Sequence, residues 1–420
     1  MSTARADLAG ELMPCVRCGQ CRSVCPVFLA KGIESDSPRG RLALVRALLQ
    51  GRIEANDLLA EKIEQCALCR TCFQECPSGV HIERIILAAR EQLAGLRGIP
   101  LQKKVLTRWL LPNLNRLRPL IPMASRAQGL VAGKVGTGEY RLPNHRLPLV
   151  GTRLVPNLTG QTIYSARRRT ATAASGRPRV ILFAGCMIAY AYPRVGRAAL
   201  EVLHHHGLEI LVPKDQTCCG LPALASGDRE AFERAKRENL AVLQGTVCDA
   251  IVTACASCGS TLKEHYQHDL PVRVYDFSEF LVDRVEFKAP RGKLDARVTY
   301  HDPCHLRKAQ GIKDQPRTLL KSIPGLSFRD VSDPDRCCGF AGTFSLSHQA
   351  LSEKIALTKV QALMHTEADT VVTTCPGCML HLANGLHNER SRARVVHLAE
   401  VLAASYRDEA AGRDGDSFPR

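Results

Sequence analysis

The sequence predicts an α/β protein in which an α-helical N-terminal domain precedes a duplicated, cysteine-rich α/β domain. Three observations lead to this class. Two runs of four cysteines near the N-terminus are joined by stretches with helical apolar spacing. Beyond residue 178, short β-branched runs alternate with helical segments, as they do in domains with parallel sheets. The same region contains one five-cysteine frame twice, which indicates an internal repeat.

These patterns divide the 420 residues into five parts: a helical domain at 1–98, a connector at 99–177, two α/β copies at 178–290 and 291–407, and a polar tail at 408–420. The connector has no cysteine and is rich in Pro, Leu and Arg. We therefore expect helices broken by prolines, followed by a flexible basic linker that ends near the sequence SGRPR.

Composition excludes several classes of protein. Hydrophobic residues make up 45% of the chain, which is enough for folded cores. The opening residues lack the apolar segment of a secretory signal, and no run approaches the roughly 18 apolar residues that span a bilayer. We expect a cytoplasmic protein with at most peripheral contact to the inner face of the membrane. Nineteen cysteines in that reducing compartment indicate metal sites rather than disulfides.

The formal charge of +16 is not taken as a sign of nucleic-acid binding. No nucleic-acid motif accompanies the basic residues, and thiolate-bound metal clusters are anionic, so they would lower the net charge. We expect no nucleic-acid partner, and an acidic protein subunit or an anionic lipid fits the charge better.

The N-terminal cysteine runs are CVRCGQCRSVCP, from Cys15, and CALCRTCFQECP, from Cys66. Both have the spacing C-x2-C-x2-C-x3-C-P of bacterial ferredoxins, in which the fourth cysteine ligates the other cluster. The predicted ligand sets are Cys15, Cys18, Cys21 and Cys76 for one [4Fe–4S] cluster, and Cys66, Cys69, Cys72 and Cys25 for the second. Zinc also accepts four thiolates, but its sites normally use two CxxC pairs. Small residues are expected to let backbone N–H groups approach the sulfurs: Gly19, Thr71 and Ser78.

Helices are expected to join the two runs. Pro38 suits a helix start and Gly51 a helix end, and a second apolar helical stripe follows the second run from Ile82 to Leu96. The 40 residues between Cys25 and Cys66 exceed the gap of a compact two-cluster ferredoxin with short strands. This favours an α-helical ferredoxin-type domain.

The C-terminal region is expected to contain parallel strands near 180–185, 209–213, 250–255, 297–302, 327–331 and 371–375. The repeated frame is Cys, a CCG turn, then CxxC. Its members are Cys186, Cys218, Cys219, Cys255 and Cys258 in the first copy, and Cys304, Cys337, Cys338, Cys375 and Cys378 in the second. Each CxxC follows a strand and precedes a helix, where ligands bind in open α/β sheets and N–H groups favour negative charge. We expect each frame to form a metal centre, iron–sulfur or zinc.

Other metal-ligating residues have simpler interpretations. Cys248 lies outside both frames and is expected to be a buried small hydrophobe. The run His204–His205–His206 precedes Gly207, so a surface helix end is favoured over a metal site. His301 and His305 flank Cys304 and are either donors near a metal centre or ordinary packing residues. No flavin or nicotinamide site is visible, because no GxGxxG motif follows a strand.

The five-cysteine frame resembles the cysteine-rich CCG domain of heterodisulfide reductase subunits, which binds a non-cubane [4Fe–4S] centre in some relatives and zinc in others. Local stretches are similar to the iron–sulfur subunit of glycolate oxidase: CVRCGQCRSVCPVF, DSPRGRLALVRALLQG, CALCRTCFQECPSGV, HDPCHLRKAQG and RCCGFAGTFSLSHQALSEKI. Iron–sulfur subunits of flavin-dependent lactate dehydrogenases and of anaerobic glycerol-3-phosphate dehydrogenase have similar motifs. Some glycolate oxidase subunits lack cysteines of the CCG frames, whereas all ten are present here.

The resemblance implies an electron-transfer subunit of a flavin-dependent 2-hydroxy-acid dehydrogenase or oxidase. A partner subunit with FAD would oxidise glycolate or lactate, and this chain would pass the electrons toward quinone or another acceptor. Two [4Fe–4S] clusters and one or two further centres are the cofactors implied. One alternative is a heterodisulfide-reductase-like subunit that reduces a disulfide at a CCG centre. The other is a scaffold in which the CCG halves hold zinc.

Overall fold

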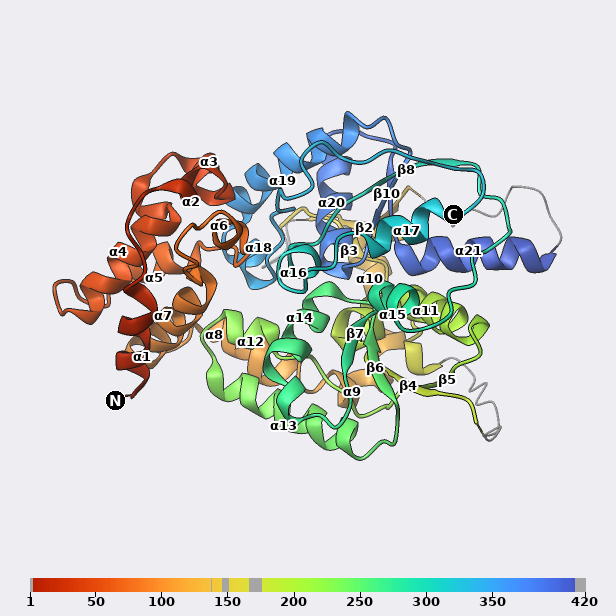
Figure 1. Cartoon of the computed structure of the whole chain (residues 1–420), viewed down its shortest axis with the longest axis horizontal. Helices are drawn as coiled ribbons and strands as arrows, with labels where there is room; N and C mark the ends of the chain where they lie inside the picture. The colour runs from red at the N-terminus through yellow and green to blue at the C-terminus, as the bar shows by residue number, and fades with distance from the viewer. Residues whose placement is uncertain (1–2, 137, 146–150, 166–175, 412–420) are drawn as a thin grey trace. The chain divides into compact units, whose positions relative to one another are not determined.

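The computed structural model describes residues 3–136, 138–145, 151–165 and 176–411 (Figure 1). The chain packs into two units. The first contains Met1–Leu110, Gly220–Arg234 and Asp335–Lys359, and the second contains the rest. The predicted domain limits therefore do not coincide with the units. In the first copy the segment after Cys219 belongs to the first unit, and in the second copy the segment that contains the CCG turn does so.

The N-terminal part of the first unit is helical, as expected. Its elements are α1 (Thr3–Leu12), α2 (Gln20–Ser23), α3 (Pro26–Lys31), η1 (Glu34–Asp36), α4 (Pro38–Leu49), α5 (Asp57–Glu64), α6 (Thr71–Gln74), α7 (Ile82–Arg97), α8 (Leu101–Lys104) and the π-helical η2 (Val105–Leu110). The short α2 and α6 occupy the same position in their cysteine runs. This part of the chain thus has an internal repeat of its own.

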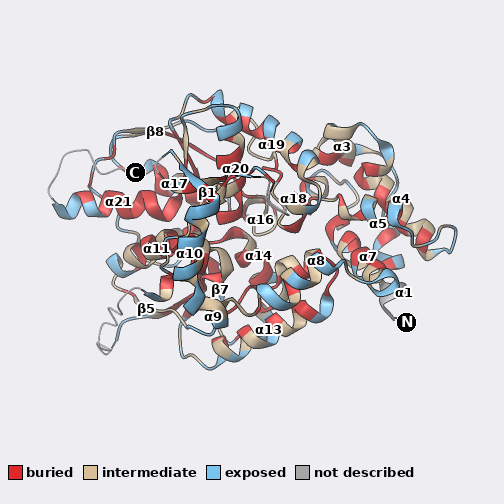
Figure 2. Ribbon diagram, turned by 180° about the vertical axis from the view of Figure 1, so that it is seen from behind, coloured by how far each residue is buried: buried red, intermediate tan, exposed pale blue. Residues whose placement is uncertain are grey.

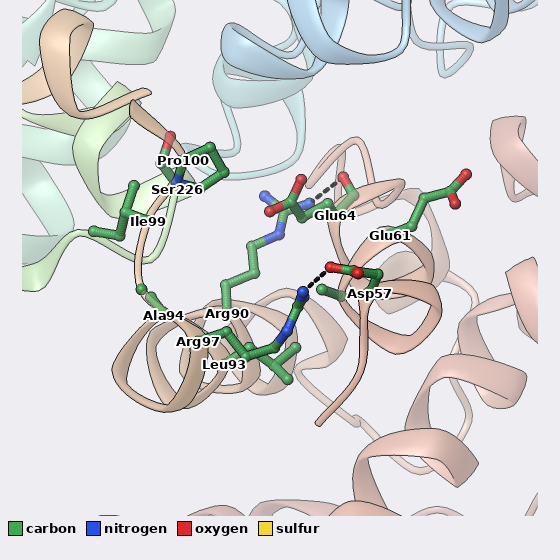
Figure 3. A pocket seen from close by; sticks show the side chains of 12 residues that line it. Asp57, Glu61, Glu64, Arg90, Leu93, Ala94, Arg97, Ile99, Pro100 and Ser226 are labelled. Carbon is green, nitrogen blue, oxygen red and sulfur yellow. Dashed lines mark hydrogen bonds and ion pairs between the residues drawn. The ribbon is translucent and has the colours of Figure 1, made fainter. Parts of the chain in front are cut away.

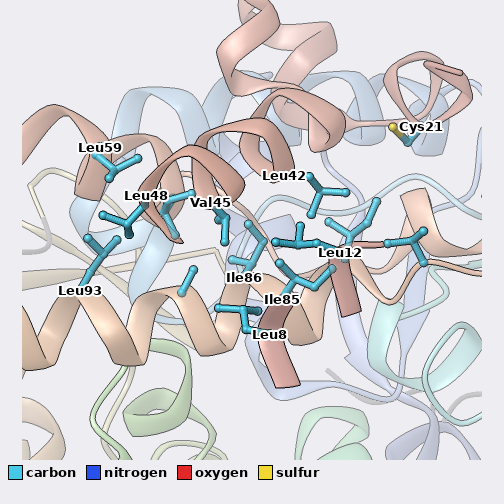
Figure 4. Packing of buried hydrophobic residues seen from close by; sticks show 14 residues of the cluster. Leu8, Leu12, Cys21, Leu42, Val45, Leu48, Leu59, Ile85, Ile86 and Leu93 are labelled. Atoms are coloured by element: carbon cyan, nitrogen blue, oxygen red, sulfur yellow. The ribbon is translucent and has the colours of Figure 1, made fainter. Parts of the chain in front are cut away.

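The core of this unit lies between the long helices α4 and α7 (Figure 4). Its buried members recur at helical spacing: Leu42, Val45 and Leu48 on α4, and Ile82, Ile85, Ile86, Ala89 and Leu93 on α7. Cys21 borders the same cluster. The apolar stripes that predicted the two helices therefore also form the support for the cysteine loops.

The ends of α4 follow from its sequence. The Ser37 side chain accepts a hydrogen bond from the Gly40 N–H at 3.0 Å, and Pro38 occupies the first helical position. Beyond the last turn, Gly51 has a φ of +70°, which few other residues adopt without strain. The expected helix between the two cysteine runs is confirmed.

The second unit contains two four-stranded parallel sheets. Their strand orders are β5-β4-β6-β7 and β9-β8-β10-β11, so the two copies share one topology. The strands are β4 (Arg179–Leu182), β5 (Glu209–Leu211), β6 (Ala250–Thr253), β7 (Val274–Asp276), β8 (Ala296–Tyr300), β9 (Leu326–Phe328), β10 (Thr370–Thr373) and β11 (Arg394–His397). The central strands β6 and β10 are buried at every residue, as expected for parallel strands.

Helices connect these strands. In the first copy they are η5 (Met187–Ala191), α11 (Pro193–His205), α12 (Leu221–Ala225), α13 (Arg229–Gln244), α14 (Ala256–His265), η6 (Gln267–Asp269) and α15 (Phe277–Asp283). In the second they are α16 (Cys304–Arg307), α17 (Gln315–Lys321), α18 (Thr343–Ser347), α19 (Gln349–Met364), α20 (Pro376–Asn388) and α21 (Leu398–Ala411). Helices α11 and α21 pack against each other, and most of α21 is buried (Figure 2).

The helix caps repeat as well. The backbone N–H of Asp276, at the end of β7, donates to Glu279 at 3.0 Å, and the N–H of His397, at the end of β11, donates to Glu400 at 2.9 Å. The side chains of Asp276 and His397 accept from the first turns of α15 and α21. The duplication therefore extends to individual polar contacts, although one copy uses a carboxylate where the other uses an imidazole.

Three features differ from the sequence-based expectation: two additional strands, a sheet in the connector and the end of the last helix. All six expected strands are present, but β7 and β11 had no sequence signal. The connector contains not only helices α9 (Leu114–Leu117), η3 (Arg118–Leu120) and α10 (Ile121–Val131) but also an antiparallel sheet of β1 (Ala132–Val135), β2 (Tyr140–Pro143) and β3 (Val155–Pro156), followed by η4 (Ile163–Ser165). Within the expected basic linker, residues 166–175 lie outside the described part. The final helix continues past the expected end of the second copy to Ala411, and 412–420 are outside the described part.

Among the described residues, none of the helices combines the length and the hydropathy that crossing a membrane requires.

Candidate metal centres

Two cavities in the first unit are lined by the cysteines of the N-terminal runs. One has Cys15, Cys18, Cys21 and Cys76 in its wall, and the other has Cys25, Cys66, Cys69 and Cys72. Each cavity therefore combines three cysteines of one run with the last cysteine of the other run. This is the crossed arrangement that the ferredoxin spacing predicts.

The backbone of both runs turns in the same way. Arg17 and Leu68 have φ values of 59° and 52°, and Gly19 and Arg70 have values of 90° and 60°. Left-handed residues at matching positions make the chain curl around each cavity, so that three cysteines face one point. At Gly19 a Cβ atom would lie 2.6 Å from Nη1 of Arg39, so a larger residue there would displace the end of that side chain.

The cysteine before each proline accepts a backbone hydrogen bond. Cys25 Sγ lies 3.5 Å from the Phe28 nitrogen, and Cys76 Sγ lies 3.4 Å from the Val80 nitrogen. Cys25 caps α3, and Pro26 takes the first helical position, where a missing N–H has no cost. N–H groups that point at sulfur favour its thiolate form, which is the form that binds metal.

The pKa values of these thiols indicate whether the cavities suit bound metal cations. Burial raises the pKa of Cys25 to about 12, although Arg41 opposes this. Burial, and then the neighbouring thiols Cys69 and Cys66, raises the pKa of Cys72 well above its usual range. The free thiols of Cys25 and Cys72 therefore stay protonated at neutral pH, and a strongly bound cation would convert them to thiolates. The donor set thus fits an iron–sulfur cluster.

Helix α4 places one arginine at each cavity. Arg39 lines the first and donates to the Arg17 carbonyl at 3.1 Å, and its side chain is 29% exposed. Arg41 lines the second and is 1% exposed. Its Nε donates to the Lys62 carbonyl at 2.7 Å, while its Nη2 has no partner among the described residues. A buried cation beside an anionic cluster stabilises the reduced state, which carries more negative charge.

We expect Arg41→Met to lower the reduction potential of the centre on Cys66, Cys69, Cys72 and Cys25 by roughly 60 mV or more, which is tenfold for a one-electron couple. Arg39→Met is the matched control on the same helix. It should have a smaller effect on the other centre, because solvent screens a partly exposed charge. Redox titration followed by EPR, at equal iron content, measures both. An equal or larger shift in the control would contradict the role given to burial.

A separate pocket of about 330 Å³ is lined by residues of α5 and α7 and by the chain that follows α7 (Figure 3). Burial lowers the pKa of Arg90, which lines this pocket, and the guanidinium donates to the Glu64 and Cys66 carbonyls at 2.8 and 2.6 Å. Two carboxylates of the pocket are paired, Asp57 with Arg97 and Glu64 with Lys103. Arg90 therefore supports the second cysteine loop, and we assign no ligand to the pocket.

The first CCG frame is assembled within the second unit. Cys186 follows β4, Cys255 caps α14 after β6, and Cys258 lies in the first turn of α14. The thiol of Cys218 contacts those of Cys186 and Cys219, and the thiol of Cys258 contacts those of Cys219 and Cys255. These contacts raise the pKa values of Cys218 and Cys258 well above their usual range. Five sulfurs therefore form one continuous group, as a thiolate-bound metal centre requires.

Two buried side chains that the sequence analysis missed hold the Cys218–Cys219 turn. Asn239 accepts from the Thr217 N–H at 2.8 Å and donates to the Cys218 carbonyl at 2.9 Å. The Tyr266 hydroxyl donates to the Cys219 carbonyl at 2.9 Å. Asn239 shares the buried stripe of α13 with Ala235 and Leu243. In the sequence, the only sign of this role was a polar residue at a position of the otherwise apolar stripe of this helix.

The second frame repeats this local structure. Cys304 begins α16 after β8, Cys375 caps α20 after β10, and Cys378 lies in the first turn of α20. The Cys337–Cys338 turn ends at Gly339, whose φ is +86° and whose carbonyl accepts from Ser352 at 2.8 Å. That turn belongs to the first unit and the other three cysteines to the second. Assembly of all five cysteines of this frame therefore stays a prediction.

The two CxxC turns lie against each other inside the second unit. The thiols of Cys255 and Cys375 are hydrogen-bond partners. Ser257 Oγ lies 3.6 Å from Cys375 Sγ and 3.1 Å from a ring nitrogen of His305, and the Ala256 N–H donates to the Thr374 carbonyl at 3.1 Å. A centre in one frame would therefore adjoin a centre in the other.

Other sequence candidates lie away from these groups. His204 and His205 end α11, and the His206 ring is bonded to the Val202 carbonyl at 2.8 Å, so the expected helix end before Gly207 is confirmed. Cys248 precedes β6, outside both frames, and is only half-buried, so the expectation of a buried residue is wrong; partial burial still raises the pKa of its thiol.

Comparison with known proteins gives domains in the same order as the cysteine patterns of the chain. A 4Fe-4S dicluster domain model matches residues 11–80, and a cysteine-rich domain model matches 180–263 and 298–383. A probable glycolate oxidase iron-sulfur subunit of Bacillus subtilis is 32% identical over 94% of this chain and 94% of its own length. This chain belongs to the glycolate oxidase iron–sulfur subunit family. The predicted resemblance and the fold class, a helical ferredoxin-type domain before duplicated α/β CCG domains, are confirmed.

Other proteins that are similar to this chain carry names that indicate different roles. One subunit of a fumarate reductase (CoM/CoB) from Methanothermobacter marburgensis is 30% identical over 95% of this chain and 73% of its own length. Lactate utilization protein A of a Geobacillus species is 33% identical over 53% of this chain and 98% of its own length. The chain is thus an iron–sulfur protein of the oxidoreductase subunit type.

Proposed function

We propose that this chain is the electron-transfer subunit of a flavin-dependent 2-hydroxy-acid dehydrogenase or oxidase that acts on glycolate or lactate. One observation carries the proposal. Within the first unit the two cysteine cavities share Ile82 in their walls, and within the second unit the two CxxC turns are in contact. Such spacing suits electron transfer between centres. The relatives named for glycolate oxidase and lactate utilization indicate the substrate class.

The cysteines have defined roles in this proposal. Cys15, Cys18, Cys21 and Cys76 hold one [4Fe–4S] cluster, and Cys66, Cys69, Cys72 and Cys25 hold the second. The two CCG frames hold one or two further iron–sulfur centres, non-cubane in type, or zinc in place of one. Bound iron–sulfur centres accept and release single electrons. The protein supplies thiolates, N–H donors and buried charge, and the centre lined by Arg41 is the better electron acceptor of the first pair.

The partner completes the reaction. The sequence carries no dinucleotide motif, so FAD and the hydroxy-acid site belong to a partner subunit, and electrons leave to quinone or another acceptor. We place the chain in the cytoplasm, with at most peripheral membrane contact.

A second candidate is disulfide reduction at a CCG centre, as in heterodisulfide reductases. Two observations favour it over a zinc scaffold: all ten frame cysteines are present, and the CoM/CoB-named relative spans nearly the whole chain. Here a substrate sulfur would bind at one of the frames.

One experiment separates these functions. The native complex is purified without oxygen, and its iron, sulfide, zinc, flavin and subunits are determined. We expect about sixteen irons for four four-iron centres, a flavoprotein partner, and dye reduction that depends on glycolate or lactate. Disulfide reduction by this chain alone, with no hydroxy-acid activity of the complex, would favour the second candidate. About eight irons plus zinc would favour a scaffold.

A further inference from the structure

His301 has an unusual environment for a polar side chain. It follows the last residue of β8 and is fully buried. Its backbone is satisfied, because the N–H donates to the Val372 carbonyl at 2.9 Å and the carbonyl accepts from Thr373 Oγ1 at 3.1 Å. Both ring nitrogens, however, have no partner among the described residues. A buried imidazole without partners is costly, so its presence requires an explanation.

The ring lies beside the second CCG frame. One ring nitrogen is within 4.8 Å of Cys378 Sγ, and Cys304 follows three residues along the chain. A neutral imidazole always has one N–H to donate. The acceptor that suits this N–H is a sulfur of the metal centre that the frame would hold.

The duplication supplies an internal comparison. In the first copy, Phe183 follows β4 and donates its backbone N–H to the Val252 carbonyl at 2.8 Å, which matches the contact of His301 with Val372. Phe183 is equally buried and precedes Cys186 by the same three residues. The two copies thus place rings at one equivalent position, apolar beside the first centre and polar beside the second.

We propose that His301 donates its ring N–H to a sulfur of the second CCG centre and so raises its reduction potential above that of the first centre. An N–H donor favours the reduced state because that state has more negative charge on its sulfurs. Since the CxxC turns of the two frames touch, this difference would direct electrons from the first centre to the second. The inference rests on the proposed function, in its form with an iron–sulfur centre in each of the two frames.

Four variants of the anaerobically loaded full chain test it: His301→Phe, His301→Gln, Phe183→His and Cys304→Ser. Potentials are measured by redox titration with EPR, and iron is counted in each sample. Cys304→Ser identifies the signal of the second centre by its loss. We expect His301→Phe to make that centre about tenfold harder to reduce, a fall of roughly 59 mV, without loss of iron. His301→Gln, which keeps an N–H donor, should restore part of the shift, and Phe183→His should raise the potential of the first centre.

Each other result counts against the inference. Unchanged potential in His301→Phe at full iron content excludes the hydrogen bond. Selective iron loss in both His301 variants would make His301 an iron ligand instead. If His301→Phe does not fold, Phe183→His decides, and an unchanged first centre overturns the proposal. Absence of iron from the second frame of the wild-type chain would overturn the inference alone, because the proposed function allows zinc in one frame; absence of iron from the whole wild-type chain would refute the proposed function itself.

Discussion

Cys76→Ser is expected to destroy the cluster that is built mainly on the other run. The variant should lose roughly four irons, and the remaining cubane signal should be that of the centre on Cys66, Cys69, Cys72 and Cys25. The reason is geometric. Cys76 lines the cavity of Cys15, Cys18 and Cys21, whereas the other three cysteines of its own run line the second cavity. Iron analysis with low-temperature EPR of the reduced protein measures the loss.

Cys25→Ser is the mirror variant and the control. It should remove the second centre and spare the first, because Cys25 lines the cavity of Cys66, Cys69 and Cys72. The two EPR spectra should then be complementary. If each substitution instead removed the centre of its own run, the crossed ligand sets would be wrong.

The parts of the protein that could be predicted from sequence depend on local spacing. In C-x2-C-x2-C-x3-C-P, ligand geometry and turn geometry are set within eleven residues, so the cavities of Cys15 and Cys66 could be anticipated. The CCG frames could be found because duplication leaves two copies to compare. The helices α4 and α7 bury long apolar stripes, which have a clear period.

The missed features depend on contacts between distant residues. Strands β7 and β11 have only three and four residues, and each runs directly into a helix, so neither has a period of its own. Asn239 and Tyr266 act on a turn that lies 20 to 50 positions earlier in the chain, as their hydrogen bonds to Cys218 and Cys219 show. The asymmetry of Phe183 and His301 has meaning only after the two sheets are aligned by their hydrogen bonds.

The close approach of η1 to the first turn of α4 depends on Gly40. Substitution of Gly40 is therefore expected to lower the stability of the chain strongly. A Cβ at this position would lie 2.0 Å from the Glu34 carbonyl oxygen and 2.9 Å from its carbon. Both are backbone atoms, so no side-chain rotation can relieve the overlap. Gly40 also lies between Arg39 and Arg41, which line the two cysteine cavities. Displacement of α4 would therefore disturb both cavities together.

We expect Gly40→Ala to destabilise the chain by about 2 kcal/mol or more, with loss of iron from both N-terminal centres. Thermal and urea unfolding of the anaerobic protein, with iron analysis, measure these effects. Gly95→Ala is the matched control, because Gly95 lies inside α7 and a Cβ there has no neighbour within 4 Å. It should stabilise the helix by up to about 1 kcal/mol and leave the iron content unchanged. A Gly40→Ala protein as stable and iron-rich as the control would show that α4 can move without cost, and that its first turn does not hold the cavities in place.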